Sequence, residues 1–335
     1  MLEWIKRQWL LSVLLVVGAA LPYLVPNQYY LYVTSLAFIW AIATYGLNLI
    51  TGYTGQLNLA HAGFFAIGAY TVGILTKEGW TFWPALVVGC LLAMGVGVMV
   101  GVISLRLKGH YFSIFTLCVG FIIYLIIEKW DSLTGGAVGL IGIPFPNAVG
   151  PITFENNPVN MYYLMLFFLL FSVFVFKRIV HSLVGRTLLA IKNSEELAQT
   201  LGISLVRNKV LAFVLSTFFA GLAGGLYSVY IRFLGAQLAS ISITFDILMY
   251  LLVGGVGTVS GPVIGTLLVT WITQYLNTWS EYRMMIFGPL LILLVIYFPK
   301  GIAGAFDLWI KRRKETKSKR RMEQAAVENH AEEAR

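Results

Sequence analysis

Ten long apolar segments dominate the sequence and constrain its fold more than any other feature. They cover residues 9–25, 30–50, 58–75, 82–105, 111–127, 161–177, 210–231, 243–257, 260–277 and 284–299. About 20 helical residues cross the hydrocarbon of a bilayer. We therefore expect an all-α, polytopic transmembrane helix bundle of about ten spans, in which the short third and eighth segments are broken or re-entrant. With 58% hydrophobic and 12% charged residues, the chain lacks the polar surface of a soluble fold.

The basic residues predict an orientation for this bundle. If the N-terminus is cytoplasmic and ten spans alternate, 20 of the 24 Lys and Arg residues lie inside. The four outside are Lys77, Lys129, Arg232 and Arg283. This asymmetry places both termini in the cytoplasm. The net charge of +9 is then explained by membrane orientation, and no nucleic-acid partner is expected.

Two polar loops and a charged tail complete the predicted organisation. Residues 128–160 form an outer loop, and residues 178–209 form a helix-prone inner loop. We expect a transmembrane domain at 1–308 and a charged cytoplasmic tail at 309–335. The tail is interpreted as solvated, with binding to anionic lipid headgroups as the weaker alternative.

The apolar segments contain almost no ionisable groups, and this narrows the function. His61 and Asp246 are the exceptions, apart from Lys177 at the last position of the sixth segment. Ion-coupled carriers normally need buried acidic or histidine relays, and membrane enzymes need clustered acids, bases or metal ligands. Cys90 and Cys118 are expected to be buried small hydrophobes without a metal or disulfide role. The chain is therefore predicted to be neither an enzyme nor a metal protein.

No phosphate-binding loop is present either. The closest glycine cluster is GGVGTVSG at 254–261, which lacks the lysine of that motif. A pump would need separate ATPase subunits on the cytoplasmic side, which would bind ATP and Mg²⁺. No cofactor is expected in this chain itself.

A polar stretch between the second and third segments is the candidate translocation pathway. Its members are Tyr53, Thr54, Gln56, Asn58 and His61. Polar groups at membrane depth need partners or water. They would line a pathway near a broken helix, whose first amides attract a carboxylate. The alternative is hydrogen bonding between helices, and His61 alone is better explained as a packed neutral residue.

The inner loop is the candidate docking site for an ATPase. Asn193 is predicted to cap a short helix with Glu196 as its capping partner, and Gly202 is placed to end that helix. Leu197 and Leu201 share one face because they are four residues apart. A helix packed on its own protein is the alternative. Arg186 and Lys192 would meet acidic groups of the ATPase or serve as ordinary membrane anchors.

Several motifs give a resemblance to a known family. ELAQTLG at 196–202 is similar to the E-A-A-x-x-x-G loop of ABC importer permeases, although the usual Ile-x-Leu-Pro ending is absent. Longer stretches resemble the branched-chain amino acid permeases of LivM type. They are GLNLITGYTGQLNLAHAGFFAIGAY at 46–70, LRLKGHYF at 105–112, LTGGAVGL at 133–140, GRTLLAI at 185–191, LGI at 201–203, AGLAGG at 220–225 and FPKG at 298–301. The resemblance covers about residues 30–305.

The resemblance implies a permease subunit that forms half of the pathway for leucine, isoleucine and valine. Its implied partners are a second, LivH-type permease, two cytoplasmic ATPases and an extracytoplasmic binding protein, in a bacterial cytoplasmic membrane. The implied ATPase-coupling residues are Arg186, Glu195, Glu196, Leu197, Ala198, Leu201 and Gly202. A permease for urea, short amides or other amino acids remains open, as does, more weakly, a carrier driven by an ion gradient.

Overall fold

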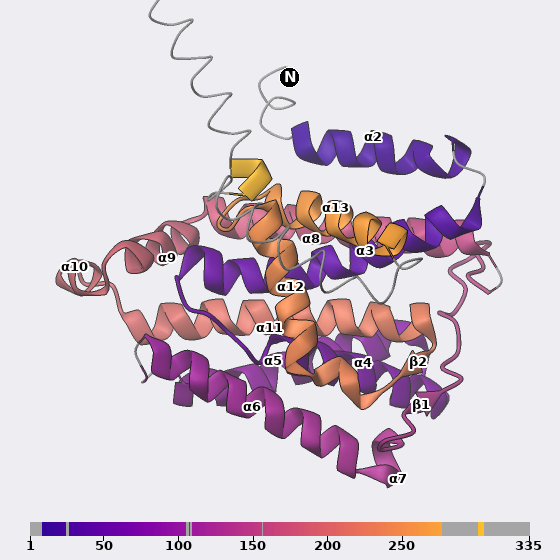
Figure 1. Ribbon diagram of the computed structural model, residues 1–335, viewed down its shortest axis with the longest axis horizontal. Coiled ribbons are helices and arrows are strands. Elements are labelled where there is room, and N and C mark those ends of the chain that lie inside the picture. Colours follow the sequence, from indigo (N-terminus) through magenta and orange to yellow (C-terminus); the bar gives the residue numbers. More distant parts are fainter. Residues whose placement is uncertain are drawn as a thin grey trace, which may run out of the picture.

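The structure, a computed structural model, describes residues 9–24, 27–104, 107, 109–155, 157–276 and 301–304, and this part of the chain is mainly helical (Figure 1). The main helices are α2 (Trp9–Leu24), α3 (Gln28–Leu47), α4 (His61–Lys77), α5 (Phe82–Ser104), α6 (His110–Lys129), α8 (Pro158–His181), α11 (Leu205–Ile231), α12 (Ile241–Gly254) and α13 (Gly261–Leu276). The shorter elements are the π-helical turn η1 (Asn48–Gly52), α7 (Asp131–Thr134), α9 (Leu183–Asn193), α10 (Glu195–Thr200) and the 3-10 turn η2 (Ala236–Ala239), together with the strands β1 (Leu140–Ile141) and β2 (Phe233–Leu234).

Helices occupy nine of the ten predicted segments, while the tenth, 284–299, lies outside the described residues. Five described helical segments are long and apolar enough to cross a membrane, namely Gln28–Gly52, Phe82–Ser104, His110–Lys129, Pro158–His181 and Leu205–Ile231. The helices in the third and eighth segments, α4 and α12, have only 17 and 14 residues. The chain is thus a multi-helical membrane bundle, and the total of ten spans and the cytoplasmic position of both termini stay predictions. The predicted tail at 309–335 also lies outside the described residues.

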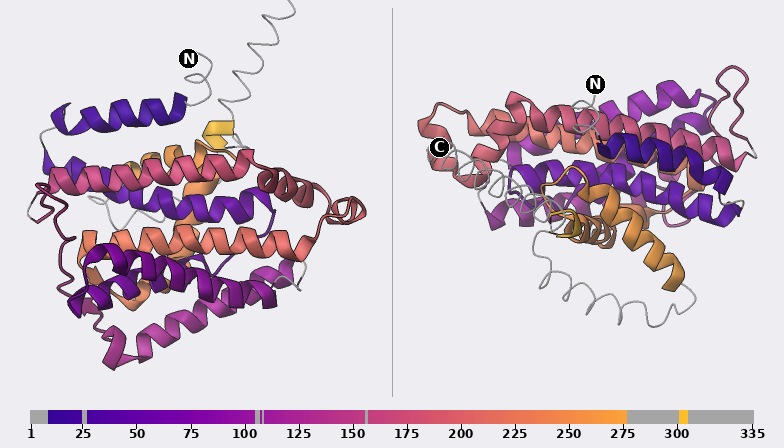
Figure 2. Two further views of the ribbon diagram at one scale, coloured as in Figure 1. Left: turned by 180° about the vertical axis from the view of Figure 1, so that it is seen from behind. Right: turned by 90° about the horizontal axis from the view of Figure 1, so that it is seen from above.

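The bundle has two distinct ends. Helices α3, α8 and α11 run lengthwise, with α9 and α10 beyond one end and β1, β2 and α7 at the other (Figure 1). The view from behind shows the same separation, with α9 and α10 projecting from the bundle (Figure 2). The inner loop and the outer loop of the sequence prediction therefore lie at opposite ends of the molecule.

Close glycine contacts hold α4 and α11 together. Gly68 on α4 faces the backbone of Gly221, and Gly224 faces the backbone oxygen of Phe65, so that neither glycine has room for a side chain. Without side chains the two helix backbones approach closely and pack by dispersion. Helix α3 lies next to them and is buried along most of its length, which places the core of the bundle around α3, α4 and α11.

A small sheet closes the end opposite α9 and α10. Leu140 pairs with Leu234 and Ile141 with Phe233 in an antiparallel register. Next to this pair, Arg232 Nε donates to Ile143 O at 2.8 Å. These contacts join the outer loop to the chain that follows α11. The prediction of an all-α fold therefore missed two short strands, because their pairing depends on segments about 90 residues apart.

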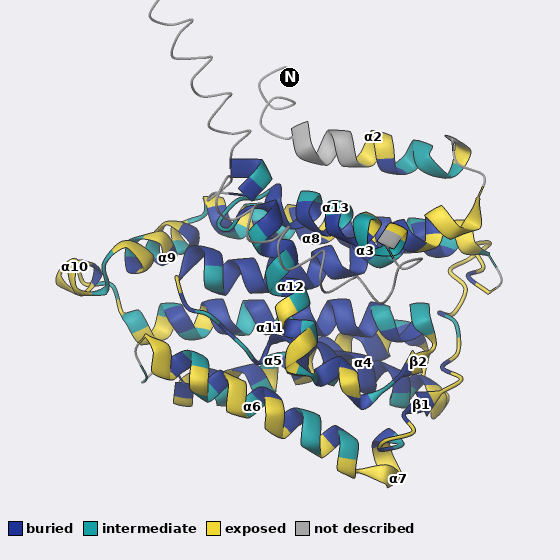
Figure 3. Ribbon diagram, viewed as in Figure 1, coloured by how far each residue is buried: buried dark blue, intermediate teal, exposed yellow. Residues whose placement is uncertain are grey.

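Helices α5 and α6 carry many exposed apolar residues, and exposed positions recur along α6 in Figure 3. On α5 these are Val87, Leu91, Leu92, Val98, Met99, Val102 and Ile103, and on α6 they are Tyr111, Ile114, Leu117, Phe121, Ile122 and Ile126. A contiguous apolar surface of this kind faces lipid or another membrane subunit. Cys118 lies exposed on α6, so the expectation that both cysteines are buried was wrong for this residue and right for Cys90.

Candidate functional site

The helical path breaks between α3 and α4. After α3 the chain forms the π-helical turn η1, and from residue 54 to residue 60 it has no helix. This segment returns from the α9 end of the bundle to its middle, where α4 begins (Figure 1). We name residues 53–60 the crossing segment. Non-helical backbone at membrane depth must find other hydrogen-bond partners or line a polar cavity.

Side chains from three places supply those partners. Thr116 on α6 accepts from Leu59 N at 3.1 Å. Thr244 on α12 accepts from Ala62 N at 3.1 Å and donates to Leu59 O at 3.3 Å. Asn58 Oδ1 accepts from Ala60 N at 3.0 Å. The starts of α4 and α12 are thereby tied together beside the crossing segment, and sequence analysis did not single out Thr116 or Thr244.

The five predicted pathway residues are all buried in or beside this segment. They are Tyr53, Thr54, Gln56, Asn58 and His61. His61 Nε2 lies 2.8 Å from Ala43 O. Since a carbonyl oxygen can only accept, Nε2 carries the proton and Nδ1 is left as an acceptor.

Several of these buried groups have unused hydrogen-bonding capacity. Gln56 Oε1, Asn58 Nδ2 and His61 Nδ1 have no hydrogen-bond partner among the described residues, and neither has Thr51 Oγ1 in η1 just before the segment. Buried polar atoms are nearly always satisfied in native proteins. Four such atoms within eleven residues give this stretch more unused hydrogen-bonding capacity than an ordinary packed core has.

A compact set of contacts surrounds the end of η1. Asn48 on η1 donates from Nδ2 to Thr258 O and accepts at Oδ1 from Gly257 N, both at 2.8 Å. Lys192 on α9 donates from Nζ to Gly52 O at 2.7 Å. The turn between α12 and α13, the inner loop and the start of the crossing segment thus meet at one point. Lys192 appeared in the sequence only as an anchor or docking residue, and this contact to the chain's own backbone was missed.

Helix α10 begins one residue later than predicted. Asn193 is the last residue of α9, and the cap of α10 is Ser194, whose Oγ accepts from Leu197 N at 3.2 Å. The prediction of Asn193 as the cap, with Glu196 as its capping partner, was wrong. Both Asn and Ser are good caps, and the choice depends on where the preceding helix ends.

The predicted end of α10 is confirmed. Gly202 has a φ of +79°, a conformation that glycine adopts readily. Gly202 N donates to Gln199 O at 2.9 Å, and Ile203 N donates to Ala198 O at 3.0 Å. These two bonds form a Schellman motif, which satisfies carbonyls that a helix end leaves free.

The candidate coupling residues divide into an exposed and a buried group. Leu197 and Leu201 are 62% and 71% exposed, whereas Ala198 is 2% exposed. Arg186 and Glu196 are exposed as well. Two large exposed leucines beside charged side chains form a surface suited to another protein. We name Leu197, Leu201, Glu196 and Arg186 the α10 surface.

Glu195 makes a contact inside the chain. Its Oε1 accepts from Lys209 Nζ at 2.7 Å, and the Lys209 side chain is only 3% exposed. The pair ties the start of α10 to the start of α11. The sequence suggested Glu195 as a coupling residue, and the structure adds a partner within its own chain that sequence analysis did not anticipate.

Within the described residues no cluster of three or more His, Cys, Asp or Glu side chains could hold a metal ion. The arrangement as a whole combines an apolar bundle, a buried polar break and an exposed α10 surface at one end. These features are those of a polytopic membrane protein of the permease class.

Comparison with known proteins identifies the family. A family model described as the permease component of branched-chain amino acid transport systems matches residues 29–295, and the chain belongs to this family. The chain is 30% identical to the high-affinity branched-chain amino acid permease protein LivM of Escherichia coli K12, over 89% of this chain and 75% of that protein. It is 23% identical to a probable LivM of Methanocaldococcus jannaschii, over 79% of this chain and 90% of that protein. It is 25% identical to the LivH permease protein of E. coli K12, over 81% of this chain and 92% of that protein. No solved structure is significantly similar to the chain.

Proposed function

We propose that this chain is the LivM-type permease subunit of an ATP-driven importer and forms half of the pathway for leucine, isoleucine and valine. The observation that carries the proposal is the family match, which extends over the bundle and over the crossing segment. The similarity to LivM at 30% identity supports the same substrate class. The buried, uncharged polar groups of the crossing segment suit a zwitterion, which they can hold weakly and release.

The energy for transport comes from two cytoplasmic ATPases, which bind ATP and Mg²⁺. The α10 surface is the proposed dock, because its exposed leucines offer apolar contacts while Glu196 and Arg186 offer charged ones. The buried Ala198 and the Glu195–Lys209 pair hold α10 against the bundle so that this surface has a fixed position. Gly202 ends the helix and leaves Leu201 at its exposed edge.

Lys192 links the proposed ATPase dock to the proposed translocation pathway by a hydrogen bond. The helix that carries it, α9, immediately precedes α10, and its ammonium group holds the carbonyl of Gly52, next to the crossing segment. A shift of α9 on nucleotide binding therefore pulls on the start of the crossing segment. In this proposal Tyr53, Thr54, Gln56, Asn58 and His61 lie along the pathway and respond to that pull.

The remaining partners follow from the same proposal. A LivH-type permease supplies the other half of the pathway, consistent with the similarity of this chain to LivH itself. An extracytoplasmic binding protein delivers the substrate at the end that carries β1, β2 and α7. The assembly lies in the cytoplasmic membrane of a bacterium and contacts its lipids.

The experiment reconstitutes the chain with its partner permease, the two ATPases and the binding protein in proteoliposomes. The expected result is leucine uptake that requires internal ATP and persists without a proton or sodium gradient. Uptake by the purified chain alone, driven by an ion gradient, would overturn the proposal.

A charge reversal tests the dock separately. Glu196→Lys should leave membrane insertion intact and reduce co-purification of the ATPases about tenfold, with a matching loss of uptake. Glu78→Lys is the matched control, because Glu78 is exposed and follows the end of α4 where Gly73 meets Leu140 of β1 and Leu234 of β2. Equal ATPase recovery from both variants would remove the α10 surface from the proposal.

A further inference from the structure

A small apolar groove lies beside the crossing segment. One wall is formed by Leu117, Gly120, Phe121 and Tyr124 on consecutive turns of α6. The other wall is formed by Leu59 and residues 239–241 at the start of α12. Its volume is about 160 Å³, well below the about 300–1,000 Å³ of sites for drug-sized ligands. The groove therefore suits a single aliphatic side chain.

The groove adjoins the buried polar groups of the candidate site. Leu59 follows Asn58, and its backbone is held by Thr116 and Thr244 at the point where α4 and α12 begin. Gly120 touches the same segment, since a β-carbon there would lie 3.1 Å from Ala60 Cα. The apolar groove and the unpartnered polar atoms therefore lie next to each other along the crossing segment. An amino acid needs both, because it has an apolar side chain and a charged backbone.

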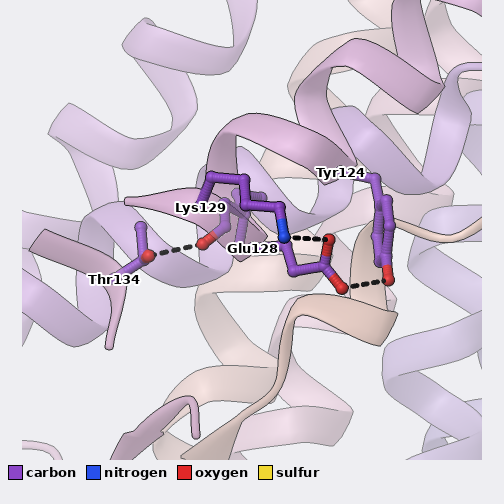
Figure 4. A network of polar contacts seen from close by, with 5 residues as sticks. Tyr124, Glu128, Lys129 and Thr134 are labelled. Atoms are coloured by element: carbon purple, nitrogen blue, oxygen red, sulfur yellow. Dashed lines mark hydrogen bonds and ion pairs between the residues drawn. The ribbon is translucent and has the colours of Figure 1, made fainter. Parts of the chain in front are cut away.

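The carboxylate of Glu128 lies next to one end of the groove. Tyr124, which lines the groove, donates its hydroxyl to Glu128 Oε1 at 2.9 Å (Figure 4). Lys129 Nζ lies 3.9 Å from the other oxygen, Oε2, and its own side chain is 79% exposed. Thr134 Oγ1 bonds to the carbonyl of Ile127 at 2.6 Å and steadies the end of α6. The carboxylate, 28% exposed, is thereby fixed within one hydrogen bond of the apolar wall.

We propose that this groove receives the branched side chain of the transported amino acid, while Tyr124 and Glu128 receive its ammonium group. The inference rests on the proposed function and adds the residues that select the side chain. Leu117 and Phe121 are 38% and 58% exposed, so the groove opens on the exposed face of α6. A phospholipid fits poorly, because its acyl chain is much larger than the groove volume of about 160 Å³.

The test fills the groove without touching the backbone. Leu117→Trp in the reconstituted importer should lower the maximal rate of leucine uptake about tenfold and that of alanine, whose methyl side chain leaves the groove nearly empty, less than threefold. The concentration of loaded binding protein at half-maximal uptake should stay unchanged, since docking occurs outside the groove. Ile122→Trp is the control, because Ile122 is 53% exposed on the same helix and does not line the groove.

The charged end is tested by Glu128→Gln, which keeps an acceptor for Tyr124 and removes the charge. Leucine uptake should fall about tenfold, whereas the neighbouring Lys129→Gln should leave it within twofold. ATP hydrolysis stimulated by the loaded binding protein reports that each variant has folded and assembled.

Two outcomes would overturn the inference. In the first, Leu117→Trp and Ile122→Trp slow the uptake of all substrates equally. In the second, Leu117→Trp takes up leucine at the normal rate but no longer co-purifies with a lipid that the unmodified chain binds. These results are distinct from failure of the proposed function, in which the unmodified importer would not take up leucine at all.

Discussion

At the residue scale, the hydroxyl of Thr244 replaces helical hydrogen bonds that the chain gives up in its crossing segment. Thr244→Val keeps the shape of the side chain and leaves Ala62 N and Leu59 O without this partner. We expect a loss of about 1–3 kcal/mol, the usual effect of unsatisfied buried groups. Thermal unfolding of the purified chain in detergent measures it.

Thr76→Val is the matched control for this change. Thr76 is also buried, but its hydroxyl bonds only to Val72 and Gly73 in its own helix. Those carbonyls belong to an intact helix, so the midpoint temperature of thermal unfolding should barely change. Equal shifts for the two variants would show that the Thr244 hydroxyl does not support the crossing segment.

A second residue-scale prediction concerns Lys192. Lys192→Met preserves most of the side-chain length and removes the donor to Gly52 O. The ATPases should still co-purify and hydrolyse ATP, while leucine uptake per ATP falls several-fold, because the dock no longer holds the crossing segment. Arg207→Met is the control, because Arg207 is an exposed basic residue at the start of α11. It should keep the normal ratio of leucine uptake to ATP hydrolysis. An unchanged ratio in Lys192→Met would show that coupling takes another route.

At the element scale, the contact between α4 and α11 depends on the absence of a side chain at Gly68. Gly68→Ala places a methyl group against the backbone of Gly221, and we expect a lower melting temperature, corresponding to about 1–3 kcal/mol from overpacking. Gly95→Ala on α5 meets nothing within 4 Å and should be neutral or stabilising by up to about 1 kcal/mol from helix propensity. Detergent melting curves of both variants test the contrast, and a Gly68→Ala protein as stable as Gly95→Ala would contradict it.

The positions and ends of the helices could be predicted from the sequence to different degrees. Apolar runs locate the helices, because lipid leaves a buried backbone few alternatives to helical hydrogen bonds. Gly202 is recognisable as a helix end since its chemistry is local. Ser194 is not, because the choice between it and Asn193 depends on the end of α9.

The missed contacts of the candidate site are those between distant segments. Lys192 and Gly52 are 140 residues apart, and Thr244 and Leu59 are 185 apart. No local pattern specifies such pairs, which depend on how the helices pack. The polar residues of the crossing segment stand out in the sequence by their composition, and the structure shows them buried. Their place along a pathway stays a prediction.

At the scale of the whole molecule, the two polar loops should be accessible from opposite sides of the membrane. In a Cys118→Ser background, which removes the exposed native cysteine, Leu201→Cys should react with a membrane-impermeant thiol reagent only after the cells are opened. Val138→Cys, at a 74% exposed position in the outer loop, should react in intact cells. If Leu201→Cys reacted in intact cells and Val138→Cys only in opened cells, the α10 surface would lie outside the cell. It could then not meet the ATPases, which would contradict the proposed function.

The pairing of β1 with β2 sets where the bundle can open. Its backbone bonds, with those of Arg232, fasten the chain after α6 to the chain after α11 at a single place. The end that carries α9 and α10 is tied through side chains instead, from Lys192 to Gly52 and from Lys209 to Glu195. A side chain exchanges its partner more easily than paired strands do, so we expect the helices to part first at that end during transport.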